Sequence, residues 1–287
     1  MCFNVNDPSG ASGLAADIAT VAAMGAHALP VMTGVLIRDT AEVLDSYDID
    51  TEALIDQARV ILEDTSIAAW KVGFLGSAEG VSAVAEIISD YADIPLVAYL
   101  GHVTWLDEER QVSYLEAFKE LILPSTTVLV GNHQVLCDLL LPDWESERSA
   151  SARELAVAAH ELGVQFVLVT GIVLPDQFID NVLATAQGAL AGERFERIDT
   201  GFVGAGDTLS AALTAILTTT DAVDVAAAEA LSFLDQALDA GFRPGMGQAI
   251  PDRFFWALPP ADEAEGEGEQ ASALDLSGPG TSPRNIH

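Results

Sequence analysis

Short, nearly continuous apolar runs alternate with longer Ala-rich stretches of helical periodicity along residues 1–258. Apolar runs of this kind are typical of strands that are buried on both faces. We predict strands at residues 28–36, 68–75, 96–100, 126–130 and 164–170. We predict helices at residues 12–24, 51–63, 78–91, 108–121, 149–162, 206–217 and 223–240. Because a strand and a helix together recur about every 30 residues, the pattern predicts βαβ units and an α/β/α sandwich with a mostly parallel central sheet.

Two further segments differ from this pattern. Residues 182–198 are more polar and contain Gly188 and Gly192, which predicts a hairpin or a pair of edge strands. The composition changes once, at Pro259, beyond which Glu, Gly, Ser and Pro dominate. We therefore predict one domain at residues 1–258 and a disordered acidic tail at residues 259–287.

The charge of the chain excludes two classes of partner. The 287 residues include 12 Lys and Arg against 44 Asp and Glu, which gives a formal net charge of −32. Nucleic acids and anionic membranes both require a positive surface, so we expect neither as a partner. A surface this acidic repels itself unless salt screens it, so we also expect a salt-adapted host.

The sequence also predicts where the protein works. Its two cysteines, Cys2 and Cys137, cannot form a disulfide framework, which favours a reducing compartment. The first residues lack the basic and apolar segments of a signal peptide. No run approaches the ~18 apolar residues of a membrane span. We therefore expect a cytoplasmic protein.

The most informative segment for chemistry is the turn at Gly204-Ala205-Gly206-Asp207, which opens an Ala-rich helix. Unpaired N–H groups at a helix N-terminus bind anions, and glycine allows a phosphate to approach the backbone. Asp207 at the helix start can accept the proton of an attacking hydroxyl group. Taken alone, the same residues also fit an ordinary N-cap after a glycine turn.

A second Gly- and Ser-rich turn, residues 6–13, precedes the first predicted helix. It also permits close approach of a ligand, or it is an ordinary loop with Ser12 as the N-cap. It does not match the Walker A phosphate loop, because it lacks the Gly-Lys-Ser/Thr ending.

Several motifs occur in an order that resembles the hydroxymethylpyrimidine/phosphomethylpyrimidine kinases of the ribokinase-like superfamily. The motifs that carry the likeness are residues 6–26, 30–40, 71–75, 123–132, 204–213 and 245–250. The resemblance implies a ribokinase-like fold and phosphorylation of the hydroxymethyl group of hydroxymethylpyrimidine, and of its phosphate, in thiamine synthesis. It implies ATP and Mg²⁺ as cofactors and a small heteroaromatic alcohol as substrate, and it allows a homodimer.

The resemblance also assigns candidate site residues. It implies that Asp207 is the catalytic base, where the pyrimidine kinases usually have Cys and other ribokinase-like kinases have Asp. It implies that the N–H groups of Gly204, Ala205 and Gly206 form an anion hole. The candidate substrate-binding residues are Gly10, Asp17, Arg38 and Phe74. The candidate nucleotide-binding residues are Asn132, Thr170, Gly171 and Thr208.

The chain also departs from the family pattern elsewhere. The strand at 96–100 lacks the Asp that usually ends it, Val135 replaces a Glu, and Thr170 replaces a Lys that meets ATP phosphates. Arg38 replaces a Gln that reads the pyrimidine, and a guanidinium suits a carboxylate or phosphate better than an aminopyrimidine edge. Two alternatives therefore stay open: a pyridoxal-type kinase, and a catalytically weakened relative that binds a ligand and regulates.

Two other polar residues lie in or just after predicted strands. Strand alternation turns Lys71 away from Trp70 and Val72, and we interpret it as a buried amine with satisfied partners. His102 follows the strand at 96–100, where it could line a pocket. The histidines show no metal-ligand spacing, and no Ser–His–Asp arrangement is evident.

Overall fold

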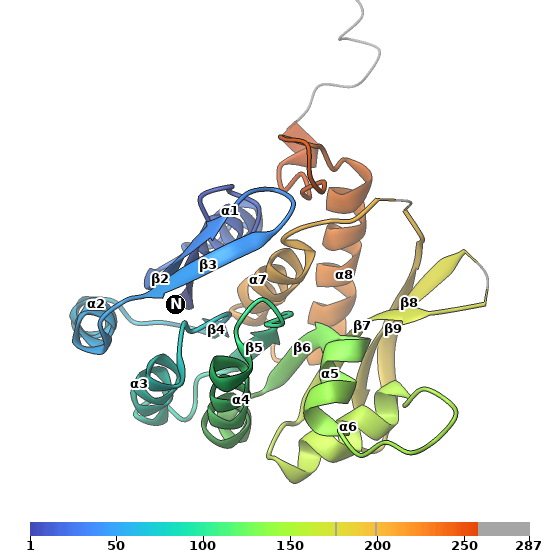
Figure 1. The fold of residues 1–287 in the computed structure, drawn as a ribbon, viewed down its shortest axis with the longest axis horizontal. Coiled ribbons are helices and arrows are strands. Elements are labelled where there is room, and N and C mark those ends of the chain that lie inside the picture. Colours follow the sequence, from blue (N-terminus) through green and yellow to red (C-terminus); the bar gives the residue numbers. More distant parts are fainter. Residues whose placement is uncertain (176, 199, 258–287) are drawn as a thin grey trace, which may run out of the picture. The chain divides into compact units, whose positions relative to one another are not determined.

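The computed structural model describes residues 1–257 except 176 and 199. In this part of the chain, nine strands form one central sheet with helices on both faces (Figure 1). The strands are β1 (Cys2–Asn6), β2 (Pro30–Arg38), β3 (Val43–Asp48), β4 (Trp70–Val72), β5 (Leu96–Leu100), β6 (Val128–Asn132), β7 (Phe166–Val173), β8 (Phe178–Thr185) and β9 (Gly188–Glu196). Their order across the sheet is β3-β2-β1-β4-β5-β6-β7-β8-β9. Strands β2, β1, β4, β5, β6 and β7 are parallel to one another. Strand β3 pairs antiparallel with β2, β8 with β7, and β9 with β8.

The helices lie in two layers on the sheet. They are α1 (Gly13–Ala23), α2 (Thr51–Asp64), α3 (Ala78–Ser89), α4 (Glu108–Ala117), α5 (His133–Leu140), α6 (Ala152–Glu161), α7 (Ala205–Leu217) and α8 (Val223–Asp239). Helices α1, α7 and α8 pack together on one face, and α2 to α6 cover the other (Figure 1). The predicted α/β/α sandwich is therefore confirmed. None of the helices among the described residues is long and apolar enough to cross a membrane.

The five predicted strands and seven predicted helices all occur; the strand at 96–100 has the predicted ends, and the others are shifted at one or both ends. The predicted strand at 68–75 is only three residues long in the sheet, because the chain leaves it at Gly73 to approach the site. The predicted hairpin at 182–198 is the β8–β9 pair, which begins earlier, at Phe178. The chain divides into the units Met1–Arg253 and Phe254–His287. The predicted tail at 259–287 lies outside the described residues.

Three elements were not predicted from the sequence. Strand β1 was missed because Asn4 and Asn6 interrupt its apolar pattern, although it lies in the middle of the sheet. Strand β3 was missed because most of its residues are exposed, and because apolar and polar residues do not alternate along it, as an edge strand allows. Helix α5 was missed because it is only eight residues long.

The sheet order locates the binding crevice. From β1 the chain forms β2 on one side and later β4 on the other, so the order reverses between β1 and β4. In parallel sheets, ligands bind beside the carboxyl ends of the strands at such a reversal. The carboxyl ends of β1, β4 and β5, and the loops that follow them, are therefore where a site is expected.

Candidate active site

Asp207 lies in the first turn of α7, close against the turn that precedes α1. The helix begins after Gly204, which has a left-handed φ of 82°. A Cβ atom at position 204 would lie only 1.8 Å from the carbonyl oxygen of Ala11, so only glycine fits there. This close packing brings Asp207 within reach of residues from β1, α1 and β4.

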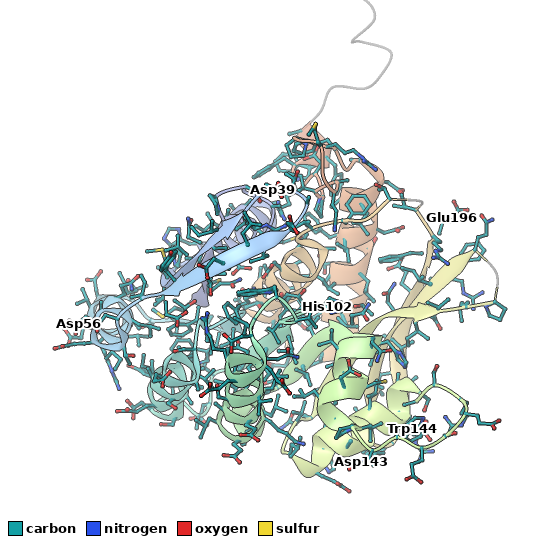
Figure 2. The ribbon with its side chains drawn as sticks, in the orientation of Figure 1. Asp39, Asp56, His102, Asp143, Trp144 and Glu196 are labelled. Atoms are coloured by element: carbon teal, nitrogen blue, oxygen red, sulfur yellow. The ribbon has the colours of Figure 1, made fainter. Side chains whose placement is uncertain are left out.

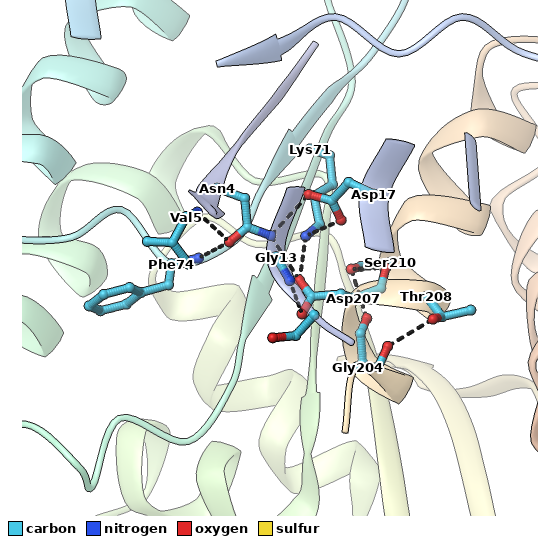
Figure 3. Close-up of polar contacts among 12 residues, drawn as sticks. Asn4, Val5, Gly13, Asp17, Lys71, Phe74, Gly204, Asp207, Thr208 and Ser210 are labelled. Carbon is cyan, nitrogen blue, oxygen red and sulfur yellow. Dashed lines mark hydrogen bonds and ion pairs between the residues drawn. The ribbon is translucent and has the colours of Figure 1, made fainter. Parts of the chain in front are cut away.

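A buried network of charged and amide groups surrounds Asp207 (Figure 3). Its Oδ1 accepts hydrogen bonds from Lys71 Nζ at 2.8 Å and from Asn4 Nδ2 at 2.9 Å. Its Oδ2 accepts one from the Gly13 N–H at 3.2 Å. Lys71 Nζ also lies 2.8 Å from Asp17 Oδ1, and Asn4 Nδ2 donates to Asp17 Oδ2 at 2.9 Å. One ammonium thus serves two carboxylates, which confirms that Lys71 is a buried amine with satisfied partners.

The amide of Asn4 is itself held in one orientation. Its Oδ1 accepts hydrogen bonds from the N–H groups of Val5 and Phe74, so its Nδ2 faces the two carboxylates. Gly73 leaves room for this amide, because a Cβ there would lie 2.5 Å from it. Sequence reasoning missed Asn4, whose only signal is a polar residue within a central strand.

The network shifts the pKa values of Asp17 and Asp207 in opposite directions. Burial raises the pKa of Asp17 to about 6, although Lys71 opposes the shift. Burial also acts on Asp207, but Lys71, Asn4 and the Gly13 N–H outweigh it and hold its pKa below the ordinary value. Burial lowers the pKa of Lys71, but its two aspartate partners raise it overall. Asp207 is therefore a carboxylate and Lys71 an ammonium at neutral pH.

Asp207 and Gly204 form part of the wall of a cavity of about 300 Å³. Aromatic side chains line another part of it: the ring centroids of Phe74 and Trp105 lie 5.1 Å apart, and those of Phe74 and Tyr114 lie 4.9 Å apart. A volume of this size suits one small heteroaromatic ring. The cavity therefore brings a carboxylate, a helix N-terminus and an aromatic surface together.

Arg38 and His102 also line this cavity. The Arg38 side chain is 8% exposed and lies 3.9 Å from Asp7 Oδ2. Its Nη1 donates a long hydrogen bond of 3.4 Å to Ser12 Oγ. His102 is exposed in the loop after β5, as Figure 2 shows. The structure thus places Arg38, Phe74 and His102 where the sequence suggested a pocket.

Two predicted substrate-binding residues do not line the cavity. Gly10 is exposed in the turn before α1. Asp17 is fully buried in α1 and contacts Lys71 and Asn4. Asp17 therefore lies behind the cavity wall, in contact with Asn4, which lines the cavity.

Comparison with known proteins identifies the family. The model of the phosphomethylpyrimidine kinase family matches residues 7–252. The chain belongs to the phosphomethylpyrimidine kinase family. A hydroxymethylpyrimidine/phosphomethylpyrimidine kinase of Streptomyces coelicolor is 30% identical over 254 residues, which cover 88% of this chain and 93% of that relative. A thiamine biosynthetic bifunctional enzyme of Arabidopsis thaliana is 31% identical over 82% of this chain, but only 45% of that enzyme is covered.

Solved structures of similar proteins share the fold. An ADP complex of Bacillus subtilis pyridoxal kinase aligns with a TM-score of 0.80 at 24% identity, covering 90% of this chain and 98% of that one. A phosphomethylpyrimidine kinase of Clostridium difficile aligns with a TM-score of 0.67 at 20% identity, covering 83% and 97%. At these identities the likeness shows the fold alone.

The residues predicted from the family to bind the nucleotide lie in two places. Asn132, the last residue of β6, pairs with Thr170, which lies within β7 and is followed by Gly171. A Cβ at Gly171 would lie 2.5 Å from Asn132 Nδ2, so these residues pack together. Thr208 is instead fully buried in the first turn of α7, where its hydroxyl donates to the carbonyl oxygen of Gly204 at 2.8 Å. The roles of all four residues remain predictions.

The cavity offers few ligands for the Mg²⁺ that the family implies. No cluster of three or more His, Cys, Asp or Glu side chains suited to a metal occurs among the described residues. Asp207 is the one acidic residue that the structure places in the cavity wall, and both its oxygens already accept hydrogen bonds. Mg²⁺ in such enzymes is held by one or two carboxylates together with substrate phosphates. These residues therefore do not fit a metal ion held by the protein.

Tyr99 lies one residue before the end of β5, the strand that in the family pattern ends with an Asp. Its ring packs on Gly206, because a Cβ there would lie 2.3 Å from the ring. The Lys71 ammonium lies 5.6 Å from the centroid of the same ring. Burial raises the pKa of Tyr99, so its hydroxyl stays protonated. A neutral aromatic group thus borders the first turn of α7.

A larger cavity of about 740 Å³ lies at the opposite end of the strands. Residues just before β5 and β6, such as Pro95 and Thr127, line it. These are amino ends, where parallel sheets do not place their ligands. We therefore assign the chemistry to the smaller cavity beside Asp207.

Proposed function

We propose that this chain is an ATP-dependent kinase that phosphorylates the hydroxymethyl oxygen of hydroxymethylpyrimidine, and in a second reaction its phosphate, in thiamine synthesis. The observation that carries the proposal is the position of Asp207. Its carboxylate stands in the wall of a ring-sized cavity, beside a helix N-terminus on one side and aromatic side chains on the other. The names of the relatives that are 30% identical support the same reaction.

In the proposed reaction, the hydroxymethyl oxygen attacks the terminal phosphorus of ATP. The new O–P bond forms as the bond to the ADP oxygen breaks, and Asp207 accepts the hydroxyl proton. Asp207 is ready for this step because Lys71 keeps it ionised. The N–H groups of Gly204, Ala205 and Gly206 stabilise the negative charge of the phosphoryl group, as donors fixed at a helix N-terminus do.

The nucleotide has its own proposed surface. It consists of Asn132 at the end of β6 and of Thr170 and Gly171 beside it in β7, and in the proposal the phosphates of ATP extend from there to the first turn of α7. Any Mg²⁺ would arrive bound to the nucleotide phosphates. We further propose a cytoplasmic location and a homodimer as the assembly. Cys2 and Cys137 are both free thiols, which suits a reducing compartment.

Pyridoxal is the second candidate substrate, and Arg38 favours it. A guanidinium only donates hydrogen bonds, whereas an aminopyrimidine edge presents both donors and acceptors. The phenolic oxygen of pyridoxal, once ionised, is an acceptor that suits Arg38. The rings of Phe74 and Trp105 would hold either heterocycle.

The proposal is tested by measuring ADP release with hydroxymethylpyrimidine, its phosphate and pyridoxal, at low and high KCl. ADP release with hydroxymethylpyrimidine supports the main proposal, and release with pyridoxal alone replaces it by the second. If calorimetry detects no ATP binding at millimolar nucleotide and no acceptor yields ADP, the chain is a regulatory relative and the proposal is wrong.

A further inference from the structure

Arg253 is a buried guanidinium that joins two turns at the start of α7. It is only 6% exposed. Its Nη2 donates to the carbonyl oxygen of Ala11 at 2.5 Å, in the turn before α1. Its Nε donates to Thr208 Oγ1 at 3.0 Å, in the first turn of α7. Arg253 therefore fixes these two turns against each other.

The same guanidinium lies directly against the first residue of the proposed anion hole. A Cβ at Gly204 would lie 2.8 Å from Arg253 Nη2 and 1.8 Å from the carbonyl oxygen of Ala11. The Thr208 hydroxyl that accepts from Arg253 donates onward to the Gly204 carbonyl oxygen. The charge of Arg253 thus adds to the positive end of the α7 dipole.

Arg253 differs from Lys71, another cation of the site, in its hydrogen bonds, which go to the neutral oxygens of Ala11 and Thr208. Lys71 contacts two carboxylates, and Arg38 lies 3.9 Å from Asp7. Burial lowers the pKa of Arg253, and the charges of nearby aspartates, Asp207, Asp17, Asp7 and Asp252, oppose this shift. A buried charge is costly unless an opposite charge compensates it. The two hydrogen bonds of Arg253 go to neutral oxygens, of Thr208 and Ala11, so its positive charge can also act on an anion bound at the adjacent turn.

We propose that Arg253 is a positioning residue that supplies the fixed positive charge of the anion hole at Gly204–Gly206. It holds the turn in which these N–H groups converge, and it balances the charge of the phosphoryl group bound there. This inference rests on the proposed kinase function and deepens it. It explains how the site neutralises phosphate charge although Thr170 is not a cation and the cavity offers no carboxylate pair for a metal.

The test compares Arg253→Met and Arg253→Lys with Arg243→Met, a matched control. Arg243 is exposed and bonds to Thr200 and to the carbonyl oxygen of Gly247, outside the cavity wall. Calorimetry with inorganic pyrophosphate measures anion binding without requiring turnover, and ADP release gives kcat and KM. Thermal melting of each variant shows how much of it is folded.

We expect Arg253→Met to weaken pyrophosphate binding about 10- to 100-fold, the usual effect of losing hydrogen bonds from a charged group. Its kcat falls by a similar factor while KM for the ring alcohol stays unchanged, and Arg243→Met behaves like wild type. Arg253→Lys, which keeps the charge, recovers part of the affinity. If Arg253→Met does not fold, Arg253→Lys provides the test by itself. We expect Arg253→Lys to bind pyrophosphate about 10-fold more weakly than wild type, because an ammonium cannot replace the planar set of N–H donors of a guanidinium.

Wild-type pyrophosphate affinity and kcat in folded Arg253→Met or Arg253→Lys would overturn the inference. An equal loss in Arg243→Met would also overturn it, since the effect would then follow net charge. If the wild-type chain binds pyrophosphate through Arg253 but releases no ADP with any ring alcohol, the kinase proposal fails and this inference survives.

Discussion

Lys71 Nζ lies 2.8 Å from Asp207 Oδ1, and the ammonium that fixes this carboxylate is itself fully buried. The same nitrogen lies 2.8 Å from Asp17. Lys71 therefore determines both where the proposed base points and that it is ionised. Several measurable properties of the chain depend on this arrangement.

Replacing Lys71 by Met leaves two buried carboxylates without their cation. Removing one partner of a buried ion pair typically destabilises a protein by about 3–5 kcal/mol. We expect a loss of that order in the free energy of unfolding, measured by urea denaturation in high KCl. The pKa of Asp207 should rise, so the acid limb of kcat/KM should move to higher pH.

Lys119→Met is the matched control, because Lys119 is the other lysine of the chain and no ion pair involves it among the described residues. It should change stability by no more than about 0.5 kcal/mol. Equal stability of Lys71→Met and Lys119→Met would show that the buried network contributes nothing.

Asp17 predicts a specific dependence of stability on pH. Its pKa is about 6 in the folded chain and about 3.9 when unfolded, so the folded state binds more protons between these values. The contribution of Asp17 to stability is therefore present at low pH and lost as pH rises through 6. Between pH 5 and pH 7.5, wild type should lose on the order of 1 kcal/mol relative to Asp17→Asn. Parallel pH profiles of the two proteins would contradict this assignment.

Arg38→Gln should change which ring the cavity prefers. A Gln amide both donates and accepts hydrogen bonds, so it matches an aminopyrimidine edge better than a guanidinium does. We expect KM for hydroxymethylpyrimidine to fall about 10-fold and KM for pyridoxal to rise, with KM for ATP unchanged. An altered KM for ATP, or equal effects on both rings, would show that Arg38 does not contact the acceptor.

Salt should stabilise the chain strongly. The net charge is −32, and Figure 2 shows acidic side chains such as Asp39, Asp56, Asp143 and Glu196 at the periphery. Cations screen their repulsion, so Tm should be higher in molar KCl than in dilute buffer. Equal Tm values in the two solutions would exclude salt adaptation.

The parallel core of the fold could be predicted because its strands bury both faces and so read as continuous apolar runs. That signal fails where polar residues enter the sheet. Asn4 interrupts β1, yet it is buried because the two carboxylates of the site satisfy it. The exposed residues of β3 show no apolar pattern, because an edge strand in contact with solvent does not have to bury both of its faces.

The site could be predicted only in part. Asp207 and the Gly204 turn stand out in the sequence because a glycine pair opens a helix. The partners of Asp207 cannot be found this way, because Asn4 and Lys71 lie 203 and 136 residues away along the chain. Arg253 follows the last recognised motif in the sequence, and only the folded structure brings it into contact with Thr208 and Ala11.

The most direct test of the account is the rate of ADP release by Asp207→Asn, measured with hydroxymethylpyrimidine and ATP. Asp224→Asn is the matched control, since Asp224 occupies the first turn of α8 and is exposed. We predict that kcat of Asp207→Asn falls by about 10²–10⁴-fold while Asp224→Asn keeps the wild-type rate. Wild-type turnover by Asp207→Asn would contradict the role of Asp207 as the base.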